Sequence, residues 1–295
     1  MVYLMEPQIK ARKYLVTGAS GYVGGRLVRS LLNEDLEVRV FVRDKEKIKG
    51  QPWFNHVEIV EGNANSESDL IAALTGVHTA FYLLHSINLG KNFDDIEAVM
   101  ARGFAKAAEA AGISQIVYLG GIANDKKSSQ HLASRVQTGT ELASGKVPVL
   151  ELRAGIIIGS GSASFEMLRH LTHRLPVMTT PKWVSNLTHP IAIRDVLYYL
   201  RGAAALEVPV DQVFDIGGPE ILSYADMMQK FAKLSGLPRR WIIKVPVLTP
   251  ELSSLWIGLV TPVPTALARP LVGSLINEVV ADPKKSINDL IPPPP

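Results

Sequence analysis

A glycine-rich loop near the N-terminus constrains the fold of this chain more than any other feature. Gly18, Gly21 and Gly24 follow the apolar run 13–17 and precede a helical run, 25–32. At such a junction the first glycine permits a tight turn, the second lets a pyrophosphate approach the backbone, and the third lets helix and strand pack closely. The helix N-terminus adds amide hydrogens and a positive dipole. The loop therefore predicts a dinucleotide site, in preference to a plain strand-to-helix connection. The expected loop contacts are Gly18, Ser20, Gly21, Tyr22, Val23 and Gly24.

Apolar, β-branched runs alternate with helix-length segments through the first half of the chain. The runs are 13–17, 38–42, 57–60, 79–84, 115–119 and 149–153. Such alternation is typical of parallel strands joined by crossover helices. We therefore predict an α/β fold of Rossmann type, with a doubly wound, mostly parallel sheet.

The expected organisation has three parts. Residues 1–12 form an N-terminal tail, 13–160 form the dinucleotide-binding core, and 161–295 form mainly a substrate lobe. Two stretches near 189–217 are expected to return to the sheet. The terminal run of prolines, 292–295, resembles a linker or the edge of a longer protein with a further C-terminal domain.

Composition excludes several classes of site. The chain has no Cys, which excludes disulfides, thiolate metal sites and a Cys nucleophile, so redox chemistry requires a bound cofactor. The formal charge of +3 and the absence of long charged blocks argue against a nucleic-acid partner. The first residues lack a signal-peptide pattern, so a cytoplasmic location is expected. The apolar region 252–276 is broken by prolines and makes a poor membrane span. Contact of Leu255, Trp256, Leu259 and Val260 with a membrane surface is a weaker alternative to packing on the body.

Arg43, at the end of the second apolar run, favours NADPH over NADH. NAD-specific proteins usually place a carboxylate there against the ribose hydroxyls, whereas Arg43 can stack on adenine and bind a 2′-phosphate. The alternative is that Asp44 binds the ribose and Arg43 is a solvated surface residue. Asn63, after the third run, is expected in the adenine pocket or in a turn.

Motifs along the chain suggest a family. They read TGASGYVGGRLV, FYLLHS, IVYLGGI, ELRAGIIIGSGSASFEML, HPIAIRDV and FDIGGPE. Over nearly all of 13–228 the chain resembles the atypical and extended short-chain dehydrogenase/reductases, particularly their NmrA-like, NAD(P)H-binding branch. The resemblance implies one sheet of about seven strands with a small C-terminal substrate lobe.

The residues that usually complete catalysis in this family are altered. Active members usually have Ser at the end of the fifth strand, Tyr-x-x-x-Lys on the next helix and often Asn on the fourth helix. Here the corresponding positions carry Gly120, then His131 with Arg135, and Gly103. His131 and Arg135 are four residues apart on one helix face, so our hypothesis makes His131 the acid and Arg135 the ribose anchor. The alternative is that His131 is an exposed helix residue.

Further candidates follow the fourth and fifth strands. Leu84, His85 and Ser86 stand at the sheet edge where ligands of open α/β sheets bind, and His85 or Ser86 could touch the nicotinamide ribose or the substrate. Gly120 is expected beside the cofactor. Tyr118 could replace the missing acid only if its side chain faces the cleft, whereas Tyr82 is expected in the core. No metal site is expected, because His170 and His173 lack a third ligand at a suitable spacing.

These features predict an NADPH-dependent reductase that acts on a small apolar carbonyl compound or activated alkene. The alternative is a non-catalytic NAD(P)H-binding sensor or scaffold, as resemblance to NmrA-like regulators implies. The sequence leaves the identity of the substrate and the oligomeric state open.

Overall fold

The computed structural model describes residues 12–85, 93–123, 129–245 and 272–295. Three features expected from the sequence fall outside these ranges. They are the tail before Arg12, Ser86, and the apolar side chains Leu255, Trp256, Leu259 and Val260.

Seven strands form one parallel sheet in the order β11-β6-β5-β4-β1-β2-β3. Because β2 and β3 lie on one side of β1 while β4 lies on the other, the order reverses beside β1. Open α/β sheets bind ligands at this reversal. The predicted doubly wound sheet of Rossmann type is thus confirmed. Its strands are β1 Lys13–Thr17, β2 Glu37–Val42, β3 Glu58–Glu61, β4 Thr79–Tyr82, β5 Gln115–Gly121, β6 Val149–Ala154 and β11 Gln212–Ile216.

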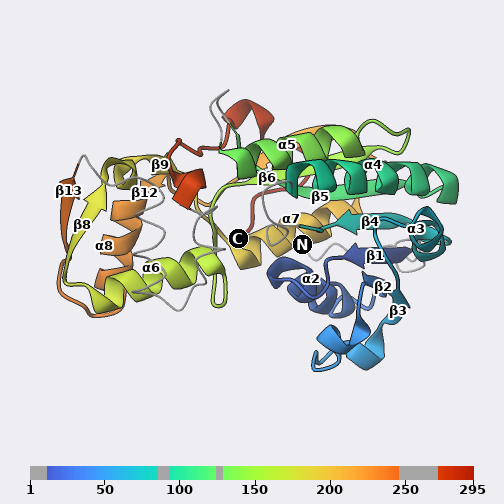
Figure 1. Ribbon diagram of the computed structural model, residues 1–295, viewed down its shortest axis with the longest axis horizontal. Helices are drawn as coiled ribbons and strands as arrows, with labels where there is room; N and C mark the ends of the chain where they lie inside the picture. The colour runs from blue at the N-terminus through green and yellow to red at the C-terminus, as the bar shows by residue number, and fades with distance from the viewer. Residues whose placement is uncertain (1–11, 86–92, 124–128, 246–271) are drawn as a thin grey trace.

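Helices cover both faces of the sheet (Figure 1). On one face α2 packs with α7, and on the other α3 packs with α4 and α4 with α5. The bounds are α2 Tyr22–Leu32, α3 Glu67–Leu74, α4 Phe93–Ala111, α5 Gln130–Leu142 and α7 Ile193–Ala205. Short 3-10 helices occupy η1 Lys45–Ile48, η2 Phe54–His56, η3 Lys182–Ser185 and η4 Pro283–Lys285.

The central strands β1, β4 and β5 are mostly apolar because both of their faces are buried. On β5, Val117 and Leu119 join the core beneath α2 and α7. Ile116 and Tyr118 point the opposite way, into the core beneath α3, α4 and α5. The alternation of side chains along one strand therefore supplies two cores.

A smaller lobe carries its own core at one end of the sheet (Figure 1). It contains α6 Ala163–Arg174, α8 Tyr224–Leu234 and two ladders, formed by β8 Val177–Pro181 with β13 Trp241–Val245 and by β9 Leu187–Thr188 with β12 Leu222–Ser223.

One expectation about the return to the sheet is wrong. Of the two expected stretches, only the second joins the seven strands, as β11. The first forms β10 Ile191–Ala192, which pairs with β7 Ile157–Ile158 in a separate ladder. Its two apolar residues are followed at once by α7, so the extended segment is too short to reach the sheet.

Candidate functional site

The glycine loop forms the tight junction between β1 and α2. Gly18 has φ +65°, and the Gly21 amide donates to its carbonyl over 2.9 Å. A Cβ on Gly24 would overlap the Gly18 carbonyl oxygen. The helix begins at Tyr22, with Gly21 as its N-cap, and its first turn holds no acidic residue. The start predicted at Gly25 is therefore three residues late.

A cleft of about 530 Å³ runs along the carboxyl ends of the strands. It brings together nearly every residue that the sequence assigns to the cofactor. Those lining it are Gly18, Ser20, Gly21, Tyr22, Val23, Gly24, Arg43, Asn63, Leu84, His85 and Arg135. Gly120 instead lines an adjoining cavity, and Ser86 lies outside the described residues.

Arg43 and Asp44 differ in what holds their side chains. The Asp44 carboxylate accepts the Glu46 amide over 3.0 Å and caps η1. Arg43 is exposed at the rim of the cleft. Asn63 lines the cleft, and its side chain also closes a turn by accepting the Asn65 amide over 3.0 Å. The expected turn is thus observed, whereas the place of Asn63 in the adenine pocket stays a prediction.

The Arg26 side chain bridges the glycine loop and the loop that follows β6. Its guanidinium lies 4.0 Å from the centre of the Tyr22 ring and donates to the Ser160 carbonyl over 2.9 Å. Gly159 lies against the Tyr22 hydroxyl. Arg26 is therefore engaged with the protein itself.

His85 and Arg135 form a hydrogen-bonded pair where the cleft meets the second cavity. Arg135 Nη1 lies 2.7 Å from His85 Nδ1, and Nη2 donates to the Leu119 carbonyl over 2.9 Å. Because a guanidinium can only donate, His85 Nδ1 must accept and its ring proton must sit on Nε2. Desolvation in the cleft, followed by the Arg135 charge, lowers the pKa of His85 to about 4. His85 is therefore a neutral N–H donor at neutral pH.

His131 lines both the cleft and the adjoining cavity, as Arg135 does. Burial, followed by the positive charge of Arg135, lowers the pKa of His131 to about 3. The side chain is thus neither fully exposed nor protonated at neutral pH. If it takes part in proton transfer, it does so as a neutral imidazole.

Glu97 on α4 is a site residue that our sequence reasoning missed. It is 5% exposed and accepts a 2.5 Å hydrogen bond from the Ser134 hydroxyl of α5. Its other carboxylate oxygen lies 3.8 Å from His85 Nδ1. A buried carboxylate therefore stands beside the Arg135–His85 pair and opposes the positive charge there. The sequence carried a signal: Glu97 interrupts the apolar helix face that runs through Met100 and Phe104.

The two tyrosines of the central strands are core residues. Tyr118 is fully buried and its hydroxyl donates to the Arg135 carbonyl over 2.9 Å. Burial raises its pKa to about 12. The condition set for Tyr118 as an acid, a side chain facing the cleft, is not met, because strand alternation turns it toward α5. Tyr82 is 1% exposed and packs edge-on against Phe104, as expected.

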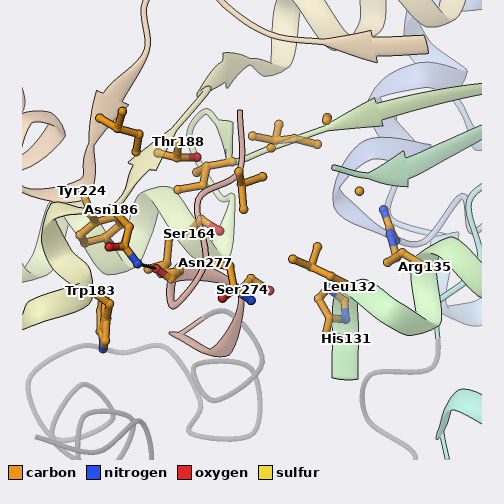
Figure 2. Close-up of a pocket in the computed structure, with 18 of the residues that line it drawn as sticks. His131, Leu132, Arg135, Ser164, Trp183, Asn186, Thr188, Tyr224, Ser274 and Asn277 are labelled. Atoms are coloured by element: carbon orange, nitrogen blue, oxygen red, sulfur yellow. Dashed lines mark hydrogen bonds between the residues drawn. The ribbon is translucent and has the colours of Figure 1, made fainter. Parts of the chain in front are cut away.

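A second cavity, of about 110 Å³, adjoins the cleft between the sheet edge and the smaller lobe. Figure 2 shows side chains of α5 on one side and aromatic and amide side chains of the lobe on the other. The labelled residues are His131, Leu132, Arg135, Ser164, Trp183, Asn186, Thr188, Tyr224, Ser274 and Asn277. Among the described residues that line it, Arg135 is the only Lys, Arg, Asp or Glu. The cavity therefore suits a neutral molecule.

Gly120 opens the floor of this cavity. A Cβ there would stand 2.6 Å from a carboxylate oxygen of Glu151, which is 3% exposed and pairs with Arg153 over 2.7 Å. The buried Glu151–Arg153 pair thus excludes a side chain where related enzymes usually have Ser.

Two negative findings concern only the described ranges. No helix within them is long and apolar enough to cross a bilayer. His170 Nε2 lies 3.6 Å from Glu166 Oε2. The same ranges contain no group of three His, Cys, Asp or Glu residues that could hold a metal ion.

Known proteins resemble this chain in sequence and fold. Residues 18–143 match the NAD(P)H-binding family. The chain is 25% identical over 252 residues to photosystem II assembly factor Ycf39 of Cyanophora paradoxa, covering 81% of this chain and 73% of that protein. Triphenylmethane reductase of Citrobacter sp., solved with NADP(H), shares the fold with a TM-score of 0.74 and 18% identity, over 96% of each chain. The NADPH-dependent quinone oxidoreductase of Escherichia coli, solved with NADPH, gives a TM-score of 0.69 and 20% identity, over 96% of this chain and 95% of that one.

These matches and the site agree on one point. The glycine loop, the switch point and the cleft all lie within or beside the matched segment, and the fold shared with triphenylmethane reductase extends over 96% of the chain. The chain therefore carries an NAD(P)H-binding domain at residues 18–143 and shares the fold of solved reductases that bind NADP(H) or NADPH.

Proposed function

We propose that this protein is an NADPH-dependent reductase of a small, neutral, apolar carbonyl compound or activated alkene. One observation carries the proposal: His131 and Arg135 line both the dinucleotide cleft and the adjoining cavity, whose other described lining residues include no Lys, Arg, Asp or Glu. A substrate in that cavity would lie next to the nicotinamide end of a cofactor in the cleft. The solved reductases with this fold were crystallised with NADP(H) or NADPH, which supports the choice of cofactor.

Arg43 supports NADPH over NADH. Its guanidinium is exposed at the rim of the cleft while the neighbouring Asp44 carboxylate caps η1. A planar guanidinium suits a 2′-phosphate, and the engaged carboxylate is poorly placed to bind ribose hydroxyls.

Reduction needs a hydride for carbon and a proton for oxygen or for the second alkene carbon. Bound NADPH would supply the hydride from C4 of its nicotinamide. The neutral His131 can donate a hydrogen bond to the substrate oxygen from one ring nitrogen, while water in the cleft delivers the proton. Arg135, held by His85 and the Leu119 carbonyl, would anchor the nicotinamide ribose. An alkene suits this set better than a ketone, because its proton can come directly from water.

A second function is favoured by one specific observation. Helix α5 reads QHLASRVQTGTEL and contains neither Tyr nor Lys. The protein would then be an NAD(P)H-binding sensor or scaffold of NmrA-like type. Similarity to a protein named as an assembly factor supports this alternative. In either case the cysteine-free chain fits a reducing compartment such as the cytoplasm.

Two measurements on the purified protein test the proposal. The first is a binding titration with NADPH and with NADH. The second follows the loss of nicotinamide absorbance when enones, quinones or aldehydes are added as substrates. We expect tighter binding of NADPH and its oxidation by at least one neutral compound. Tight binding without oxidation across the panel would favour the sensor. His131→Ala and Arg135→Ala then test the two roles, since turnover at the parent rate by both variants would remove them from the mechanism.

A further inference from the structure

The ladder of β8 and β13 exposes an apolar face at the end of the smaller lobe. Val177 is 53% exposed, Trp241 72% and Ile243 52%. The two strands are parallel, with Trp241 beside Val177 and Ile243 beside Thr179, so these four side chains share one face. Figure 1 shows both strands at the extremity of the molecule. The face is apolar although it points away from the body.

The opposite face of the same ladder is packed against the lobe. Met178 is 2% exposed and Ile242 packs against the same lobe core. The inner face therefore accounts for the stability of the ladder. The exposed Trp, Ile and Val on the outer face need a different explanation, because a strand with one solvated face normally presents polar side chains there.

Positive charge predominates in the segments that carry this outer face. Segments 167–190 and 227–245, which build the ladder and the helices beside it, contain no Asp or Glu. Arg169 is paired with Glu166, and Lys230 with Glu220. Within these two segments, the exposed cations for which the described residues offer no ion pair are Lys182, Lys233, Arg239 and Lys244. Arg239 stands just before β13, Lys244 near its end and Lys182 directly after β8.

We propose that this end of the lobe docks on an anionic lipid bilayer surface. The indole of Trp241 would sit at the headgroup level with Ile243 and Val177 beside it, and the surrounding cations would face lipid phosphates. The outer face is too small for a typical protein partner, since a stable interface takes about 20–30 residues from each side. A bilayer, in contrast, accepts a few apolar side chains individually. This site is distinct from the apolar region 252–276 considered from the sequence, and it does not depend on the proposed reductase activity.

Co-sedimentation of the full chain with phosphatidylcholine vesicles, with and without phosphatidylglycerol, tests the proposal. We expect binding to the anionic vesicles, release by high salt, and little binding to phosphatidylcholine alone. Arg239→Glu with Lys244→Glu should weaken binding to anionic vesicles by at least about fivefold for each residue. Trp241→Ser should also weaken it. Each variant is first checked for NADPH binding and helix content, so that loss of fold is recognised.

Two matched control variants distinguish binding through this surface from nonspecific binding to vesicles. Val208→Ser removes an apolar side chain that is as exposed as Trp241, 72%, and Lys106→Glu reverses an exposed charge on α4. Both should bind vesicles as the parent does. The proposal is overturned if the parent ignores anionic vesicles, if it binds neutral vesicles equally, or if Trp241→Ser and the double reversal bind like the parent. Concentration-dependent dimerisation that Trp241→Ser abolishes would also overturn it, by assigning the face to a second copy.

Discussion

At the scale of single residues, Arg43 should decide which dinucleotide binds. Arg43→Ala removes a charged donor that is worth about 1.5–3 kcal/mol to a phosphate. We therefore expect the Kd for NADPH to rise at least about tenfold, while the Kd for NADH changes little. Fluorescence titration of both cofactors measures this. Lys47→Ala, an exposed cation on η1, is the control and should leave both values near those of the parent. Equal losses for NADPH and NADH would contradict the assignment.

His131 should make the stability of the protein fall as the pH falls. Its pKa is lowered to about 3 in the folded protein, whereas an unfolded imidazole takes up its proton near pH 6.5. Between these values the unfolded state binds more protons, so the free energy of unfolding drops toward acid pH by up to about 1.4 kcal/mol per pH unit. His131→Gln should reduce that slope in urea titrations between neutral and mildly acidic pH. His56→Gln, at an exposed position, serves as the control, and an unchanged slope in the His131 variant would disprove the shift.

Several site residues could be predicted from their place after a strand, and others could not. His85 follows β4 and Arg43 follows β2, and the carboxyl ends of parallel strands meet at one edge. The pairing of His85 with Arg135 could not be predicted, because it depends on how α5 packs over β5. Glu97 was not predicted as a site residue, because a carboxylate in a helix is normally expected to be exposed to solvent. Only the fold shows that the Ser134 hydroxyl lies opposite it.

At the scale of elements, two glycines that both lie in helices, Gly24 in α2 and Gly103 in α4, should respond in opposite ways. Gly24→Ala would drive a Cβ into the Gly18 carbonyl and open the junction of β1 and α2, so we expect loss of NADPH binding. Gly103 lies inside α4 with nothing within 4 Å of the Cβ position. Gly103→Ala should stabilise the protein by about 0.5–1 kcal/mol and leave the Kd for NADPH unchanged. Denaturation and titration of both variants check the pair, and tight NADPH binding by the Gly24 variant would refute the close approach.

The local sequence pattern was sufficient to predict the bounds of some helices and strands and insufficient for others. The strand runs were predicted within a few residues, because they are rich in apolar and β-branched side chains, as buried parallel strands usually are. Gly112 follows α4 with φ +67°, the left-handed conformation in which glycine commonly ends a helix. The start of α2 was placed at Gly25 because three glycines resemble a loop, yet the close packing of Gly24 on Gly18 lets the helix begin at Tyr22. The separate ladder of β7 and β10 depends on contacts between distant segments, which no local pattern encodes.

At the scale of the whole molecule, the lobe core is separate from the two cores that flank the sheet. Met228, which is 1% exposed, belongs to the lobe cluster, whereas the fully buried Leu27 belongs to the cluster between α2, α7 and the sheet. Truncating either side chain to Ala should cost about 2–5 kcal/mol through lost burial and the cavity that remains. The Met228 variant should therefore lose stability in the smaller lobe, and the Leu27 variant in the sheet and its helices.

NADPH distinguishes the two truncations. Leu27 lies on α2, whose N-terminus forms the glycine loop, so Leu27→Ala should weaken NADPH binding as well as stability. Met228→Ala should change the Kd for NADPH by no more than about twofold, as expected for distant sites that share no partners. Calorimetry should then show the lobe melting earlier in the Met228 variant, while NADPH at about 100 times its Kd still stabilises the sheet by about 2.7 kcal/mol. A single transition that NADPH shifts equally in both variants would instead mean that lobe and sheet unfold as one unit.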